Sequence, residues 1–260
     1  MKGIFSAFWA ESLKIRRSKI FLITILVFLI IPMMMSFLIF VSKNPEISSK
    51  LGIVGIKASL LGKYDWPAYL GLLTQMIAAL GIMGFGFVTS WVFGREYSDH
   101  TVKDLLALPV SRSFIVLSKF IVVVIWCVLL SFILFVFGVM AGGIIQLSGW
   151  SSEIAFHSAY IFTITSLLTI LLCTPVAFFA SYGRGYLLPM GFVIFTLIIA
   201  NFIGLVGLGP YFPWAIPGIY SSASGIEGMQ LGTISYIILY LTSISGLIGT
   251  FAWWHFADQN

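Results

Sequence analysis

Residues 20–41 read IFLITILVFLIIPMMMSFLIFV, an apolar run without one charged side chain. A helix of this length rises about 33 Å, enough to cross a hydrocarbon core roughly 30 Å thick. The run is too long for the apolar part of a signal peptide, and no small-residue cleavage site follows it. It therefore predicts a retained transmembrane helix.

The composition extends this prediction to the whole chain. Apolar residues make up 60% of the sequence and charged residues only 9%, whereas a soluble domain carries about 25% charged residues. We expect an all-α polytopic membrane protein with a single domain over residues 1–260, because no repeat or second domain is evident. The six expected transmembrane spans cover about residues 20–41, 69–93, 120–142, 155–181, 186–208 and 231–256.

Two shorter segments differ from the spans. Residues 1–19 form a basic amphipathic stretch, which predicts an interfacial helix on the membrane surface. Residues 209–218 place three prolines among aromatic residues, which excludes an ordinary spanning helix. We expect a short re-entrant or interfacial element there, between the fifth and sixth spans.

The 14 lysines and arginines set the expected orientation. With the N-terminus inside, ten of them fall in cytoplasmic segments and four in the first outer loop. This bias predicts a multi-pass protein of the cell membrane with both termini in the cytoplasm. The four outer lysines argue the other way. They are Lys43, Lys50, Lys57 and Lys63.

Motifs of catalysis are missing from the sequence. There is no phosphate-binding GxxxxGK[ST], no HExxH and no CxxC. The acidic residues fall in connections or at span ends, so we expect no carboxylate relay within the membrane. We therefore predict no catalytic residue, no metal site, no cofactor and no enzymatic activity in this chain.

Other polar features have ordinary explanations. The net charge of +5 lies mostly beside apolar spans, which favours contact with membrane lipid over nucleic acid. The amides of Gln75 and Asn201 are the main polar exceptions within spans, and we interpret both as hydrogen-bonding groups between helices.

The connection after the second span holds the most informative pattern. Val102, Leu105 and Leu106 form one apolar stripe of a short helix over about residues 95–108, and Pro109 ends it. Ser98 or Asp99 is a suitable N-cap. Such a helix can lie on lipid or insert into a groove on a partner protein, and the sequence pattern leaves both open.

This connection resembles the signature of membrane permeases of ATP-binding-cassette (ABC) exporters of the type-two group. Within that group it is most similar to permeases of bacitracin and lantibiotic-type peptide export or immunity systems. His100 departs from the pattern, because many members carry a glycine before the threonine. The matching residues are Glu96, Thr101, Leu105, Leu106, Pro109, Ser111 and Arg112.

The resemblance implies a coupling helix that docks on a separate ATP-hydrolysing subunit. Val102, Leu105 and Leu106 would be buried anchors, and Glu96 and Asp99 would make polar contacts beside Thr101. The resemblance also implies a homodimer, or a heterodimer with a second permease, that exports a hydrophobic or amphipathic substrate such as a peptide antibiotic. The small-residue faces of the second and fifth spans are the candidate path.

Two other functions remain open on the sequence. A non-transporting membrane scaffold or assembly factor would need no ATP-hydrolysing partner. An intramembrane enzyme would need polar residues that meet in mid-span, and the sequence offers no good candidates.

Overall fold

The computed structural model describes residues 2–50, 65–102, 110–222 and 231–256, and these residues contain helices and no strands. Six helical spans are long and apolar enough to cross a membrane, which confirms the all-α prediction. They are α2 (Lys19–Lys43), α5 (Trp66–Ser98), α7 (Arg112–Ile144), α8 (Ser152–Leu171) continued by α9 (Cys173–Tyr182), α10 (Leu187–Leu205) and α12 (Thr233–Phe256).

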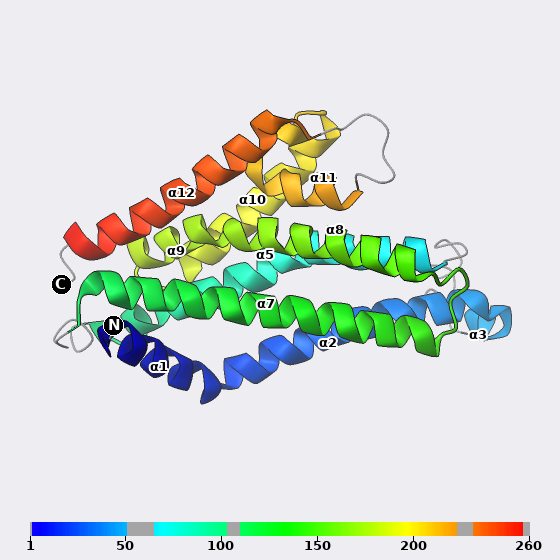
Figure 1. The fold of residues 1–260 in the computed structure, drawn as a ribbon, viewed down its shortest axis with the longest axis horizontal. Helices are drawn as coiled ribbons and strands as arrows, with labels where there is room; N and C mark the ends of the chain where they lie inside the picture. Colours follow the sequence, from blue (N-terminus) through cyan, green and yellow to red (C-terminus); the bar gives the residue numbers. More distant parts are fainter. Residues whose placement is uncertain (1, 51–64, 103–109, 223–230, 257–260) are drawn as a thin grey trace.

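Helix α5 is the centre of the bundle (Figure 1). Of the 18-residue apolar stretch of α5, 67% is buried inside the bundle, whereas the corresponding share is 28% in α2 and 17% in α10. It packs against α7, α8, α9 and α10. Helices α2, α10 and α12 lie outside and keep wide apolar faces, as expected for surfaces in contact with lipid.

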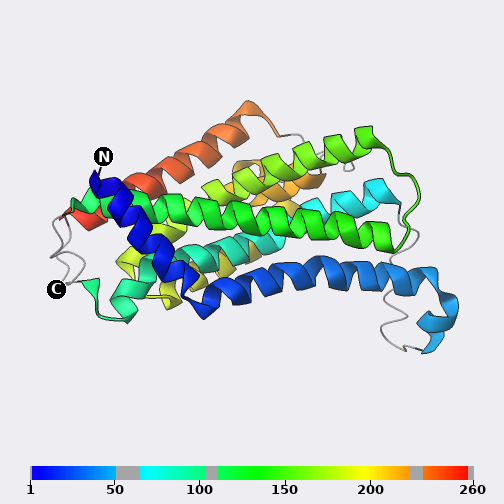
Figure 2. The same cartoon turned by 60° about the horizontal axis from the view of Figure 1, so that its bottom comes forward.

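One end of the bundle gathers both chain termini (Figures 1 and 2). Helix α1 (Lys2–Arg16), the last turns of α5 and α12, and the first turns of α7 all lie there. Helix α1 packs on α7 and crosses the direction of α2 (Figure 2). The short helix α3 (Pro45–Lys50) lies at the opposite end.

Helices α5 and α7 extend beyond their expected spans at this end. Helix α5 continues through Ser98, so residues 95–98 belong to it rather than to a separate amphipathic helix. Helix α7 already begins at Arg112, capped by the Ser111 hydroxyl. Lys119, expected just before the third span, is therefore inside a helix and completely buried.

Buried side-chain hydrogen bonds join the helices within the bundle. The Tyr69 hydroxyl of α5 donates to the Gly138 carbonyl of α7 at 2.9 Å and lies 2.8 Å from the Ser36 hydroxyl of α2. The Trp126 indole of α7 donates to the Thr24 hydroxyl of α2 at 3.1 Å. These bonds fix helix positions where lipid supplies no hydrophobic driving force.

Pro175 explains why the fourth span is built of two helices. A proline has no N–H, so the carbonyl four residues earlier, on Leu171, loses its helical partner. The Thr174 hydroxyl donates to that carbonyl at 3.0 Å. The same hydroxyl lies 2.6 Å from the Ser243 carbonyl of α12, so the break is also a contact between spans.

The proline-rich stretch after α10 folds into short pieces. Two 3₁₀ turns, η1 (Gly209–Tyr211) and η2 (Pro213–Ala215), lead into α11 (Ile216–Ser222). Helix α11 packs against α5 and α8, with Ile216 fully buried. Its expected re-entrant position in a bilayer stays a prediction.

Candidate functional site: a buried ion cluster at the end of α5

The end of α5 is a tight, fully hydrogen-bonded turn. The Thr101 N–H donates to the Glu96 carbonyl at 2.9 Å, and the His100 N–H donates to the Tyr97 carbonyl at 3.3 Å. This pair of bonds is the Schellman motif, whose penultimate position adopts the left-handed conformation usually given to glycine. His100 occupies it with φ 56°, so it adopts the conformation that the glycine of the family pattern would favour.

Glu96 combines this turn with a buried charge. Its carbonyl accepts the bond from Thr101, while its carboxylate points into the bundle and is 3% exposed. Oε2 of Glu96 lies 2.7 Å from Nζ of Lys119 on α7. Oε1 lies 3.0 Å from Nζ of Lys14 on α1. One carboxylate therefore joins three helices.

Lys119 is the most deeply buried member of this group. Its ammonium donates to Glu96, to the Val92 carbonyl at 2.8 Å and to Oε2 of Glu11 at 3.4 Å. It also lies 5.9 Å from the centre of the Phe93 ring. Three oxygen partners match the three N–H donors of a lysine ammonium group, so its hydrogen-bonding capacity is satisfied within the bundle.

Helix α1 supplies the other two charges. Glu11 is 5% exposed, and Lys14 donates to its Oε1 at 2.8 Å as well as to Glu96. Burial lowers the pKa of Lys14, but attraction to Glu96 and Glu11 outweighs burial and leaves that pKa above its ordinary 10.5. Lys14 is therefore fully protonated at neutral pH.

These four side chains, Glu11, Lys14, Glu96 and Lys119, are called the ion cluster below. Two carboxylates and two ammonium groups alternate around it, so the formal charges cancel. A buried pair stabilises little compared with apolar side chains of the same shape, but removing one partner leaves an uncompensated buried charge. The cluster thus fixes the relative positions of α1, α5 and α7.

Arg112 fastens the same end to α12. Its Nη1 donates to the carbonyls of Trp254 and His255 in the last described turn of α12, at 3.3 and 3.2 Å. The Trp254 indole in turn donates to the Ser181 hydroxyl of α9 at 2.9 Å. Both charged ends of the family-like stretch, Glu96 and Arg112, are therefore bound within the chain.

The predicted coupling residues have different positions. Glu96 is buried in the ion cluster, and Val102 is 6% exposed. Asp99 and Thr101 are exposed. The carboxylate oxygen Oδ2 of Asp99 lies 3.2 Å from Nε of Arg95. Leu105 and Leu106 lie outside the described residues, so their role as anchors stays a prediction.

The ion cluster was not predicted from the sequence. Glu11 has helical spacing with Phe8 and Ile15 on the buried side of α1, and Ile15 is 8% exposed. Lys119 has the same relation to Val116 and Val123 on α7, both buried. A charged residue at a core position of an apolar helix is the signal that could have revealed each.

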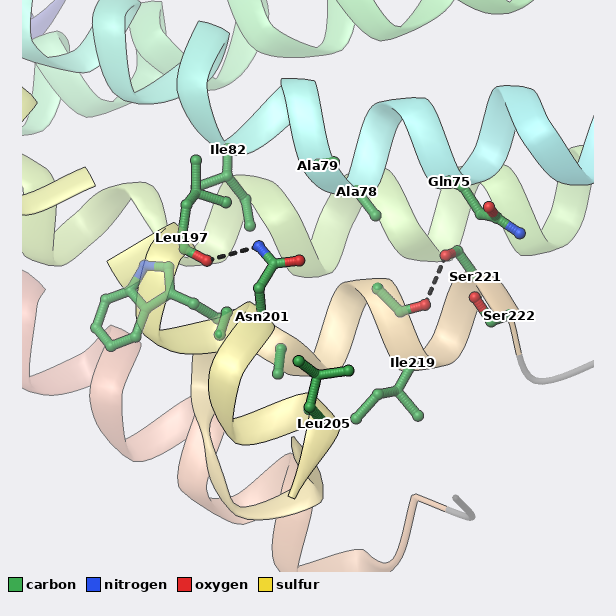
Figure 3. Close-up of a pocket in the computed structure, with 15 residues that line it drawn as sticks. Gln75, Ala78, Ala79, Ile82, Leu197, Asn201, Leu205, Ile219, Ser221 and Ser222 are labelled. Atoms are coloured by element: carbon green, nitrogen blue, oxygen red, sulfur yellow. Dashed lines mark hydrogen bonds between the residues drawn. The ribbon is translucent and has the colours of Figure 1, made fainter. Parts of the chain in front are cut away.

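A cavity of about 410 Å³ lies between α5, α10 and α11 (Figure 3). Gln75 reaches it from α5 and Asn201 from α10, and Ser221 and Ser222 line its α11 side (Figure 3). The Asn201 amide donates to the Leu197 carbonyl of its own helix at 2.8 Å. The rest of the wall is apolar and combines small with large residues. The small ones are Ala78, Ala79, Ala200, Ala215, Gly204 and Gly218, and the large ones are Ile82, Leu197, Leu205, Trp214 and Ile219.

A second cavity of about 510 Å³ adjoins the first. Both are lined by Gln75, Ser221 and Ser222, and the second continues to Pro67 and His157 near the first turns of α5 and α8. Together they follow α5 toward the end of the bundle opposite the ion cluster. Gln75 and Asn201, interpreted from the sequence as hydrogen-bonding groups between helices, thus both line a cavity.

Comparison with known proteins places this geometry in a family. Residues 7–201 match the ABC-2 family of transporter proteins, and this range contains the ion cluster and the turn at His100. The chain is 27% identical over 183 residues to the bacitracin transport permease protein BCRB of Bacillus licheniformis, which covers 70% of this chain and 88% of that protein. With three quarters of its length matched, the chain belongs to the ABC-2 family of transporter proteins and is a membrane permease.

Proposed function

We propose that this permease carries a hydrophobic or amphipathic substrate out of the cell, and that a separate subunit hydrolyses the ATP. The match to the ABC-2 transporter family across residues 7–201 carries this proposal. Sequence patterns for binding phosphate or for hydrolysis are missing from the chain itself. The ATP-binding subunit would therefore be a partner protein.

We infer that the partner docks at residues 95–108. The turn at His100 leaves Asp99 and Thr101 exposed at the end of the bundle where the termini gather. Leu105 and Leu106 would enter an apolar groove of the partner, as an amphipathic helix does. Glu96 and Val102 would support this surface from inside the chain, because both are buried.

The ion cluster gives the docking segment a rigid base. A partner that displaces the turn at His100 would also displace Glu96. Glu96 is bound to α7 through Lys119 and to α1 through Lys14. Helices α1, α5 and α7 would then move as one body when the partner subunits close on ATP. Rigid-body motion of this kind is a common way to open a path between packed helices.

The two adjoining cavities along α5 are the proposed substrate path. Their walls combine small and large apolar residues with the amides of Gln75 and Asn201 and the hydroxyls of Ser221 and Ser222. Such a lining suits a molecule with an apolar body and a few hydrogen-bonding groups. The name of the Bacillus licheniformis relative, a bacitracin transport permease, favours a peptide antibiotic as that molecule.

The proposed assembly is a pair of permeases with two ATP-binding subunits in the cell membrane. Each permease would have both termini in the cytoplasm, following the bias of lysine and arginine. The proposal is tested by purifying the chain from native membranes in mild detergent. A stoichiometric partner that hydrolyses ATP supports it. A chain that purifies without such a partner in every detergent and nanodisc tried supports a scaffold role instead.

A further inference from the structure

We propose that the elbow between α1 and α2 binds the phosphate group of an anionic phospholipid. A pocket of about 480 Å³ opens there between the end of α1 and the last turns of α5. Three cationic side chains line it, together with the hydroxyl-bearing Ser18 and the indole of Trp91. The three are Lys14, Arg17 and Arg95.

The two arginines of this pocket are not fully paired within the described part of the chain. Nη1 of Arg95 is buried and makes no hydrogen bond within the described part of the chain. The rest of that guanidinium is held in place, with Nε 3.2 Å from Asp99 and the group 5.0 Å from the centre of the Trp91 ring. Arg17 is exposed and has no ion pair among the described residues.

The charge of the pocket is positive after its pairs are counted. Lys14 is balanced within the ion cluster and Arg95 is paired with Asp99, so Arg17 adds a charge without an acidic partner among the described residues. Fork-shaped guanidinium groups bind phosphate oxygens with two parallel hydrogen bonds. Arg17 and Arg95 are suited to that geometry from two sides of one pocket.

Apolar surfaces around the elbow favour a lipid over a soluble phosphate. On α1, Phe5 and Trp9 are 67% and 57% exposed, as expected for a helix that lies in the membrane interface. Directly beyond the elbow, α2 exposes Leu22, Ile23 and Leu26. A headgroup in the pocket would therefore have its acyl chains alongside α2, and basic pockets beside membrane helices are known to hold anionic headgroups.

A bound lipid would connect the membrane to the ion cluster. Lys14 lines the pocket, and its ammonium group binds Glu11 and Glu96. The elbow lipid would thus hold α1 against the bundle at the point where the cluster ties it to α5. This inference goes beyond the proposed transport function and does not require an ATP-hydrolysing partner.

Native mass spectrometry of the full chain in mild detergent tests the site. The purified chain is mixed with dioleoyl phosphatidylglycerol or dioleoyl phosphatidylcholine at matched concentrations, and the retained lipid is measured. We expect one phosphatidylglycerol to be retained in preference to phosphatidylcholine. Arg17→Gln should weaken that retention about fivefold, the effect of roughly 1 kcal/mol per basic residue. Arg17→Lys should keep most of it.

Arg16→Gln is the matched control, because Arg16 is the neighbouring exposed arginine and does not line the pocket. It should retain the lipid like the unchanged chain, and Arg95→Gln should weaken retention as Arg17→Gln does. Equal retention of the two lipids would overturn the proposal, as would equal losses in Arg16→Gln and Arg17→Gln. Displacement of the lipid by millimolar inorganic phosphate would identify a site for soluble phosphate and also overturn it.

Discussion

Nζ of Lys119 lies 2.7 Å from Oε2 of Glu96, and neither side chain is more than 3% exposed. Lys119 lies on α7, after the proposed docking segment, and Glu96 lies at the start of that segment, in the last turns of α5. Their contact therefore joins α5 directly to α7, the helix that follows the segment. Because both charges are removed from water, each depends on the other for its stability in the folded protein.

Lys119→Met should destabilise the chain strongly. It leaves the buried Glu96 with Lys14 alone, and loss of one partner of a buried pair costs about 3–5 kcal/mol. The buried thiols of Cys127 and Cys173 report unfolding, because a thiol-reactive fluorophore reaches them only when the bundle opens. We expect labelling to begin at a clearly lower temperature in Lys119→Met than in the unchanged chain.

Two comparisons separate the buried charge from a general effect of losing a lysine. Lys43→Met removes an ammonium that donates to exposed carbonyls of Ile145 and Gln146, so it should change the labelling temperature little. The double variant Lys119→Met with Glu96→Gln should recover much of the loss, because no unpaired charge remains. A double variant as unstable as Lys119→Met would contradict the account of the ion cluster.

Above neutral pH, the contact of α1 with the bundle should fail only when Lys14 loses its proton. The pKa of Lys14 is raised above its ordinary 10.5 in the folded chain. Its contribution to stability is therefore complete below pH 10.5 and is lost as the pH rises through the higher folded value. Spin labels at Ser12 on α1 and Ser113 on α7 measure the distance between the helices by electron paramagnetic resonance.

This distance should stay constant from pH 6 to pH 10 and become broadly distributed only at higher pH. In Lys14→Met, the broadening of the distance distribution above pH 10 should be absent, because the side chain that loses its proton there is gone. Separation of α1 from α7 near neutral pH would show that another group controls the contact.

Gly246→Ala should disturb the packing of α12 on α9. A Cβ atom at Gly246 would lie 2.7 Å from Cα of Pro175 and 2.6 Å from the carbonyl carbon of Thr174, and backbone atoms cannot swing aside. Overpacking of this kind costs typically 1–3 kcal/mol. The thiol-labelling temperature should fall accordingly. Gly191→Ala on α10 is the control, because no atom lies within 4 Å of its added Cβ.

Ala200→Trp should block the proposed path without affecting partner binding. Its indole would fill the cavity between α5 and α10. Bacitracin is the probe, and the measurement is how strongly it stimulates ATP hydrolysis by the complex. We expect the apparent affinity for bacitracin in this assay to fall about tenfold, which corresponds to about 1.4 kcal/mol. Ile198→Trp lies on the exposed face of α10 and should leave that stimulation intact. Equal effects of the two variants would argue against a path in this cavity.

A cysteine introduced at Ser48 tests the orientation. Ser48 lies in α3, in the first loop, at the end opposite the termini. Both native cysteines are buried, so a membrane-impermeant thiol reagent reports the new residue alone. Labelling from outside intact cells is expected. Labelling only after the cytoplasmic side is opened would reverse the topology.

The six spans could be predicted from sequence because each depends on a local property. An apolar run such as residues 20–41 has one stable solution in lipid, a helix that satisfies its own backbone. The hydrogen bond of Thr174 next to Pro175 is also a local feature, since a hydroxyl beside a proline can donate to the carbonyl that the proline leaves unpaired. These features need no knowledge of which helices are neighbours.

The ion cluster could not be predicted because it depends on which helices meet. Glu11 and Lys119 are 108 positions apart in sequence, and only the packing of α1 on α7 brings them within 3.4 Å. The expected third span began after Lys119, at about residue 120, whereas α7 already begins at Arg112 and takes Lys119 into its buried face. The left-handed turn at His100 had only a partial signal: many family members carry glycine at this position, but a histidine is not by itself enough to predict a positive φ.

The most direct test of the docking segment is the binding of the ATP-hydrolysing partner by Leu105→Asp and Leu105→Met, compared in mild detergent. Leu105→Asp would place a charge in the proposed apolar contact, whereas Leu105→Met would keep its volume and apolar character. We predict that Leu105→Asp inserts into the membrane and loses the partner, while Leu105→Met keeps it. Normal partner binding by Leu105→Asp would contradict the assignment of residues 95–108 as the docking segment.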